Sequence, residues 1–274
     1  MLHRTVIVGL SLCGALSFLV GSVSAQITDA VESEPALVHH SLKVILDPQN
    51  QSLSVEDTVT LPDSMLAAPV NFSLNSDLRI TNKPNRLKAL AANTQVDVPG
   101  INNTGGLAAA TTEYSVSPPR RNRNQIVLIY SGTIFDTAEQ TSAEYAQSFA
   151  ESSGIISEQG VYLNKGSVWV ADFGSDLISF DLQVEFADSA SSWTAVSQGD
   201  RLGGNGWQSD QPMEEVYLIA ANFIEYSQRA DDVEVLAYLR TPDPDLATKY
   251  MDATGRYLAL YEPLLGEYPY SKFA

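Results

Sequence analysis

Histidine is the residue type that limits the chemistry this chain can carry out. The 274-residue sequence contains three histidines, His3, His39 and His40. His39 and His40 are neighbours in a stretch with strand character. Neighbouring residues in a strand point to opposite faces, so these two imidazoles do not converge on one metal ion. A catalytic zinc takes about three protein ligands, mainly histidine with a carboxylate. No H-E-x-x-H motif occurs, and we therefore predict no metal ligand and no catalytic residue in this chain.

Other patterns that support catalysis are incomplete. A serine triad would need the same histidine pair, and no G-x-S-x-G motif is present. Residues 203–206 predict a turn and lack the Lys-Ser/Thr of a phosphate-binding loop. Acid pairs at Glu214 and Glu215, and at Asp231 and Asp232, are typical of turns and surfaces, although a carboxylate pair for glycoside hydrolysis stays open. The tryptophans are expected in the core or at sheet edges more than in a ligand groove: Trp169, Trp193 and Trp207.

The composition is that of an acidic, globular protein. Hydrophobic residues make up 44% of the chain and charged residues 18%, a balance that predicts a packed core. Asp and Glu number 33 against 16 Lys and Arg, which gives a formal net charge of -17. This charge repels phosphate backbones and anionic lipids, so the sequence argues against nucleic-acid and membrane-surface partners.

The N-terminal residues have the pattern of a signal peptide. Arg4 provides a positive charge, residues 6–20 are apolar, and residues 23–25 (Val-Ser-Ala) fit a signal-peptidase site. We predict a signal peptide over residues 1–25, a linker over residues 26–36, and export to the periplasm or the extracellular space. The apolar run is too short for a membrane span. Cys13 is the sole cysteine, so the exported chain is expected to carry no disulfide and no thiolate site.

Residues 37–240 predict a β domain, because short apolar or alternating runs recur between turn residues. The turn at residues 48–51 joins two such runs as a hairpin. We expect a mostly β fold, a sandwich or saddle-like sheet assembly, interrupted by an irregular excursion at residues 89–125. The expected strands are residues 42–46, 53–61, 70–74, 126–130, 167–173, 177–186, 193–196, 216–223 and 233–239.

The periodicity changes after Arg240. Residues 241–245 (Thr-Pro-Asp-Pro-Asp) are a helix-start pattern, with prolines and acids at permitted positions. Apolar residues then recur on one face of an amphipathic helix that is expected to end near Tyr261. Residues 268–274 have the character of a strand. We therefore expect residues 241–274 to begin a second domain whose remainder is missing from this sequence.

Several segments in this order resemble the N-terminal region of aminopeptidase N-like (gluzincin) zinc metallopeptidases. One of them contains Gly160 and Trp169, although Val170 and Ala171 stand where that family usually has Tyr-Pro. The likeness covers residues 37–274 apart from the excursion. The matching segments are residues 40–48, 53–61, 160–163 with 167–169, 180–184 with 193–199, 212–220, and 257–265 with 268–274.

The resemblance implies that the chemistry belongs to a missing α-rich, thermolysin-like domain. In that family this domain carries H-E-x-x-H, a downstream glutamate and one zinc ion, and the whole protein hydrolyses peptides from the amino terminus. The family's β domain supplies an acid or amide that holds the substrate's amino group. Glu158 or Gln159 is the nearest counterpart here. The resemblance thus implies a chain that forms one wall of a peptide cleft.

A self-contained exported β-sandwich module for binding or structural support, with no catalytic activity, is the alternative. It predicts that the C-terminal helix packs on the β domain and leaves no apolar face exposed. The missing-domain hypothesis predicts the opposite, an uncovered apolar helix face. The sequence does not choose between oligomeric states.

The small number of histidines has a direct consequence for the purified chain. We expect it to bind no stoichiometric zinc and to hydrolyse no aminoacyl anilide, because it lacks a complete ligand set and a base beside it. Elemental analysis after dialysis against zinc, together with an anilide assay, checks both points. Metal-dependent hydrolysis by this chain alone would contradict the prediction.

Overall fold

The structure is a computed structural model that describes residues 37–84, 86–93, 108–117, 124–137, 139–140 and 150–274. The predicted signal peptide (1–25) and linker (26–36) lie outside the described residues, as do parts of the predicted excursion. Within the described residues, no helix is long and apolar enough to span a membrane.

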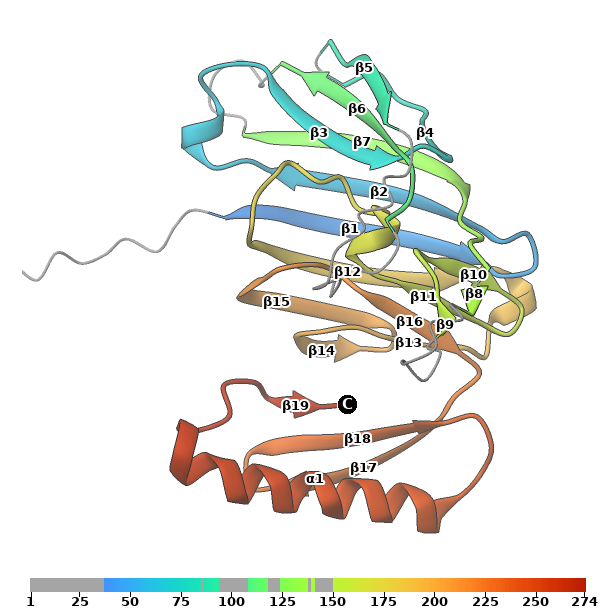
Figure 1. Cartoon of the computed structure of the whole chain (residues 1–274), viewed down its shortest axis with the longest axis vertical. Coiled ribbons are helices and arrows are strands. Elements are labelled where there is room, and N and C mark those ends of the chain that lie inside the picture. Colours follow the sequence, from blue (N-terminus) through green and yellow to red (C-terminus); the bar gives the residue numbers. More distant parts are fainter. Residues whose placement is uncertain (1–36, 85, 94–107, 118–123, 138, 141–149) are drawn as a thin grey trace, which may run out of the picture. The chain divides into compact units, whose positions relative to one another are not determined.

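The largest sheet contains the predicted hairpin, and its strands lie in the order β14-β15-β12-β1-β2-β7-β4. Figure 1 shows β1 at its centre, between β2 and β12. β1 pairs antiparallel with β2 and parallel with β12. The strands are β1 (Val38–Asp47), β2 (Ser52–Thr60), β4 (Leu78–Ile80), β7 (Gln125–Thr133), β12 (Ile178–Phe186), β14 (Asp200–Gly203) and β15 (Gly206–Met213).

Smaller sheets and short helices complete the β-rich part. One sheet has the order β10-β11-β16-β13, another β3-β6-β5, and β8 pairs with β9. The strands are β3 (Val70–Asn75), β5 (Lys88–Asn93), β6 (Thr111–Val116), β8 (Glu139–Gln140), β9 (Ala150–Glu151), β10 (Ile155–Ser157), β11 (Gly160–Leu163), β13 (Thr194–Val196) and β16 (Leu218–Ala221). The 3-10 helices are η1 (Asp63–Met65), η2 (Lys165–Ser167) and η3 (Asp188–Ala190).

Side-chain alternation explains why β1 and β2 form the centre of the core. In β1 the even-numbered residues are buried, and in β2 the odd-numbered apolar residues are buried. The register places Val44 opposite Val55 and Leu46 opposite Leu53, so both strands present their apolar side chains to the same face. The predicted mostly β fold class is confirmed, and the hairpin turn lies where residues 48–51 predict it.

The expected strand at residues 167–173 is wrong. Asn164 caps the 3-10 helix η2 by accepting a hydrogen bond from the Ser167 amide, and Val168 then has a left-handed φ of 46°. Asp172 forms an isolated bridge to Ser73. The apolar run reflects burial of a loop, because Trp169 is buried and its Nε1 donates to the Val216 carbonyl at 2.9 Å.

The predicted strand at residues 216–223 is shorter in the structure, and the family-like segment at residues 212–220 is divided between two sheets. β15 ends at Met213 in the largest sheet, and β16 begins at Leu218 in another. Between them, the Ser197 hydroxyl and the Gln198 side chain bond to main-chain groups of Glu215 and Tyr217. These bonds hold the crossing segment where a continuous strand was expected.

The C-terminal part forms a small sheet with a helix on it. The elements are β17 (Ile224–Ala230), β18 (Val233–Leu239), α1 (Pro244–Leu265) and β19 (Lys272–Phe273), with the sheet order β17-β18-β19. Asp243 caps α1 by accepting a hydrogen bond from the Leu246 amide at 2.9 Å. Val235, Ala247 and Met251 form a separate buried cluster between helix and hairpin. The predicted helix is confirmed, and it ends four residues later than expected, since it continues past Pro263 and is terminated by Gly266. The domain boundary after Arg240 stays a prediction.

The core of the largest sheet contains a buried polar pair. His40 is 1% exposed, and its Nδ1 lies 2.9 Å from Asp57 Oδ2, whose side chain is fully buried. The ring of Phe173 lies 6.2 Å from that of His40. Tyr130 on the neighbouring strand is also buried, and burial together with the Asp57 charge raises its pKa well above the ordinary value. The His40–Asp57 pair is therefore a buried polar interaction on an otherwise apolar face of the sheet.

Removing the Asp57 carboxylate should destabilise the fold strongly. Asp57→Ala leaves His40 buried without its partner, and we expect the free energy of unfolding to fall by about 3 kcal/mol. Glu56→Ala is the matched control, since Glu56 lies on the opposite face and pairs with Lys43 at 3.3 Å in solvent; we expect a loss below about 1 kcal/mol. Urea unfolding measures both. Equal small losses would contradict the prediction.

Candidate functional site

Glu158 and Gln159 form the two-residue turn that joins β10 to β11. Ser157 pairs with Gly160 across the hairpin, and the Ser157 hydroxyl donates to the Gly160 carbonyl at 3.1 Å. Both turn side chains are exposed. The turn thus places a carboxylate and an amide together on the surface, where either can accept a hydrogen bond from a ligand's ammonium group.

Arg240 holds this turn from a distant part of the chain. Its Nη1 donates to the Gln159 carbonyl, and its guanidinium lies 6.0 Å from the centre of the Phe223 ring. Gly160 has a φ of +156°, and a Cβ there would lie 2.7 Å from Arg240 Nη2. The positive φ favours glycine at this position, and the missing Cβ leaves room for the arginine beside the turn. Arg240 was not predicted from the sequence, since nothing in its local pattern indicates this contact.

A second cationic contact joins the small C-terminal sheet to the β-rich part. Lys272 of β19 donates to the Ser197 carbonyl at 2.8 Å and lies 4.8 Å from the Trp207 ring centre. Burial lowers the Lys272 pKa, and the Asp200 charge opposes that shift. Arg201 also lies over the Trp207 ring and pairs with Glu225 of β17 at 2.7 Å. Two cations thus contact one buried indole at this junction.

Helix α1 has an apolar face that the described residues leave uncovered. The exposed residues are Tyr250, Tyr257, Leu260, Tyr261, Leu264 and Leu265, and the leucines at 264 and 265 are 72% and 82% exposed. Beside this face lies a groove of about 800 Å³ between α1, the β17–β18 turn and the segment leading into β19. Isolated exposed leucines are ordinary, but a continuous apolar helix face marks a contact surface.

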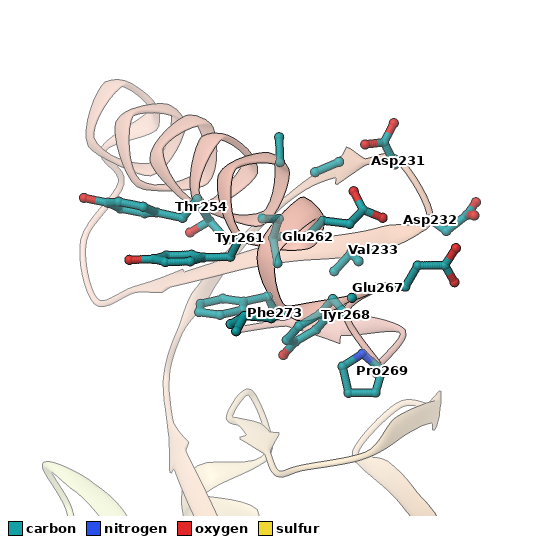
Figure 2. Close-up of a pocket in the computed structure, with 16 residues that line it drawn as sticks. Asp231, Asp232, Val233, Thr254, Tyr261, Glu262, Glu267, Tyr268, Pro269 and Phe273 are labelled. Atoms are coloured by element: carbon teal, nitrogen blue, oxygen red, sulfur yellow. The ribbon is translucent and has the colours of Figure 1, made fainter.

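The groove has an aromatic part and an acidic part. Figure 2 shows Tyr261, Tyr268 and Phe273 in one region of it, and Asp231, Asp232, Glu262 and Glu267 in another. Asp231 lies in the turn between β17 and β18 with a left-handed φ of 50°, as expected of a turn acid. Among the described residues, no group of three or more His, Cys, Asp or Glu side chains is arranged to hold a metal ion.

The other residues singled out from the sequence have structural roles. His39 and His40 point to opposite faces as predicted. His39 Nδ1 forms a hydrogen bond with Ser179 Oγ, 2.9 Å away. Glu215 accepts a hydrogen bond from the Lys165 amide at 2.6 Å. Two of the tryptophans are fully buried and the third is half-buried, as the sequence predicted for core residues: Trp169, Trp207 and Trp193.

The comparisons with known proteins identify the fold. Neither a protein-family model nor a curated protein matches the chain. The M1 zinc metallopeptidase from Deinococcus radiodurans is similar with a TM-score of 0.53 and 15% identity, over 86% of this chain and 55% of its own. Yeast LTA4 hydrolase in complex with bestatin is similar with a TM-score of 0.53 and 10% identity, over 85% of this chain and 36% of its own. This chain has the fold of part of an M1 zinc metallopeptidase structure.

These matches confirm, at the level of the fold, the resemblance to aminopeptidase N-like peptidases. A third structure, the aminopeptidase N family protein from Idiomarina loihiensis, aligns with a TM-score of 0.49 and 9% identity over 85% of this chain and 38% of its own. The chain spans 55% or less of the length of these structures.

The exposed face of α1 should bind hydrophobic dyes. We expect Leu260→Gln combined with Leu264→Gln to reduce Nile red fluorescence by about half, because it interrupts the apolar face without touching the buried cluster. The unfolding midpoint should stay unchanged. Leu202→Gln, an exposed leucine 60% accessible on β14, is the control and should have no effect. Equal fluorescence of the double variant and the wild type would contradict the prediction.

Proposed function

We propose that this chain is the N-terminal, non-catalytic portion of an exported zinc-dependent aminopeptidase-like metallopeptidase. The observation that carries the proposal is the fold likeness to the Deinococcus radiodurans zinc metallopeptidase, which covers 86% of this chain and 55% of that protein. In the proposed whole protein, peptides are hydrolysed from their amino terminus. A fold likeness at 15% identity supports the architecture, and the activity is our inference from it.

The uncovered face of α1 supports a further domain over a self-contained module. A self-contained module predicts no exposed apolar face on this helix, and six large apolar residues are exposed there. A domain packed on that face would remove their side chains from water, which favours association by about 25 cal/mol for each Å² of apolar area. We propose that this domain carries the zinc.

The zinc chemistry in this proposal belongs to the rest of the polypeptide. The described residues contain no cluster fit to hold a metal ion, so no reaction step is assigned to them. A zinc ion bound elsewhere in the whole protein would polarise the peptide carbonyl and a water molecule. The role proposed for this chain is to form one wall of the peptide cleft, where Glu158 or Gln159 binds the substrate's amino group.

Export is proposed from the sequence alone. Residues 1–25 combine Arg4, an apolar stretch and a small-residue cleavage pattern. The strongly acidic composition suits a soluble protein of the periplasm or the extracellular space. Peptides are the proposed substrates, and nucleic acid is not a proposed partner.

The decisive experiment is to sequence the coding DNA beyond the codon for Ala274. We expect the frame to continue into an H-E-x-x-H motif and a later glutamate, and the polypeptide so encoded to release aniline from aminoacyl anilides in a zinc-dependent way. Treatment with a chelator should abolish the activity, and zinc should restore it. A stop codon directly after Ala274 would overturn the proposed function.

A further inference from the structure

The Glu158–Gln159 turn is bound to a residue 81 positions further along the chain. Arg240 donates from Nη1 to the main-chain carbonyl of Gln159. This bond engages the backbone of the turn and leaves both turn side chains exposed to solvent. The Arg240 bond therefore fixes the position of the turn, while the Glu158 carboxylate and the Gln159 side-chain amide remain exposed.

Gly160 lies against the same guanidinium. A Cβ at this position would meet Arg240 Nη2 at 2.7 Å and the Ala220 carbonyl oxygen at 3.3 Å. The glycine lies between the guanidinium on one side and β16 on the other, since Val161 pairs with Ala220. Any side chain here would displace either the arginine or the hairpin.

Arg240 lies where the β17–β18 hairpin passes into α1. Ile224 pairs with Leu239 at the base of the hairpin. Phe223, whose ring faces the guanidinium, comes directly before Ile224 in the sequence. Three residues after Arg240, the Asp243 amide donates to Tyr226 Oη at 3.1 Å and Asp243 caps α1. The arginine thus contacts the residue before the hairpin, and the helix that follows it is held to the same hairpin through Asp243.

We propose that Arg240 is a positioning residue that holds the Glu158–Gln159 turn at a fixed place relative to α1 and its sheet. The substrate side of this inference rests on the proposed function: the turn binds the amino group of a peptide, and α1 leads into the zinc domain. One guanidinium then fixes where the amine-binding turn lies relative to the helix that would lead into that domain. A turn already held in place spares the cost of ordering it when the amine binds, so its release should weaken binding.

Arginine suits this role better than lysine. Its planar guanidinium directs one N–H to the Gln159 carbonyl while the second nitrogen packs on Gly160 and the plane lies near the Phe223 ring. A lysine ammonium is a point charge on a flexible stem and cannot make these contacts together. The position therefore requires the shape of the side chain as well as its charge.

Hydrogen–deuterium exchange of this chain tests the contact directly. We expect Arg240→Gln and Gly160→Ala each to speed exchange in the peptide spanning residues 155–163 about threefold to tenfold, the effect of losing a solvent-screened charged hydrogen bond. Arg240→Lys should give a similar increase. Arg229→Gln is the matched control, since Arg229 is on the same hairpin and donates to the Asp232 carbonyl at 3.3 Å; it should leave this peptide unchanged. Unchanged exchange in the first two variants, or equal acceleration in the β1–β2 hairpin, would overturn the proposal.

Kinetics of the longer polypeptide test its consequence. We expect Arg240→Gln to raise KM for an aminoacyl anilide about tenfold while kcat changes less than about twofold, because uniform binding of the amine is lost. Arg229→Gln should alter neither constant. An inactive wild-type polypeptide would refute the proposed function, and the exchange measurement would still decide whether Arg240 holds the turn. An active wild type whose KM is unaffected by Arg240→Gln would refute the positioning role alone.

Discussion

The structure depends on strand β1 being paired along both edges. Its ten residues bond antiparallel to β2 and parallel to β12, so every second side chain is forced into the interior. That geometry buries Leu42, Val44 and Leu46 and with them His40, whose imidazole needs a partner in the same layer. Asp57 provides it from the neighbouring strand. The polar pair is thus a consequence of register, since a shift by one residue would expose the apolar side chains.

Local patterns were sufficient to predict the four longest strands, β1, β2, β7 and β12, whereas β15 and β17 were not among the expected strands. The β1–β2 hairpin, β7, β12, β18 and α1 each have a period or a turn pattern within a few residues, and these elements are present in the structure. Residues 167–173 show where this reasoning fails. Here Asp172 bridges to Ser73 and Trp169 donates to the Val216 carbonyl, and both partners are distant in sequence. An apolar run indicates burial, and it indicates a strand only where another strand is free to pair with it.

Glu158 and Gln159 were singled out by the family resemblance and by no local pattern of their own. The structure places them as the two residues of the β10–β11 turn, and their binding role stays a prediction. Arg240 was not predicted, because its contact with Gln159 arises only when two sheets come together. Lys272 is a similar case, since it donates to the carbonyl of Ser197, 75 residues away in sequence, and lies over the ring of buried Trp207. Cations that join separate elements have no local pattern by which a sequence identifies them.

The parallel pairing of β1 with β12 has a consequence for how the chain folds. His39 and Ser179, which bond across that pair, are separated by 140 residues, whereas β1 and β2 are joined by a tight turn. The hairpin can therefore form early, but the other edge of β1 stays open until β12 is available. Pairings of such long range make folding slow, and an open apolar strand edge is prone to pair with other chains. The folding yield of this protein should therefore fall steeply as its concentration rises during refolding.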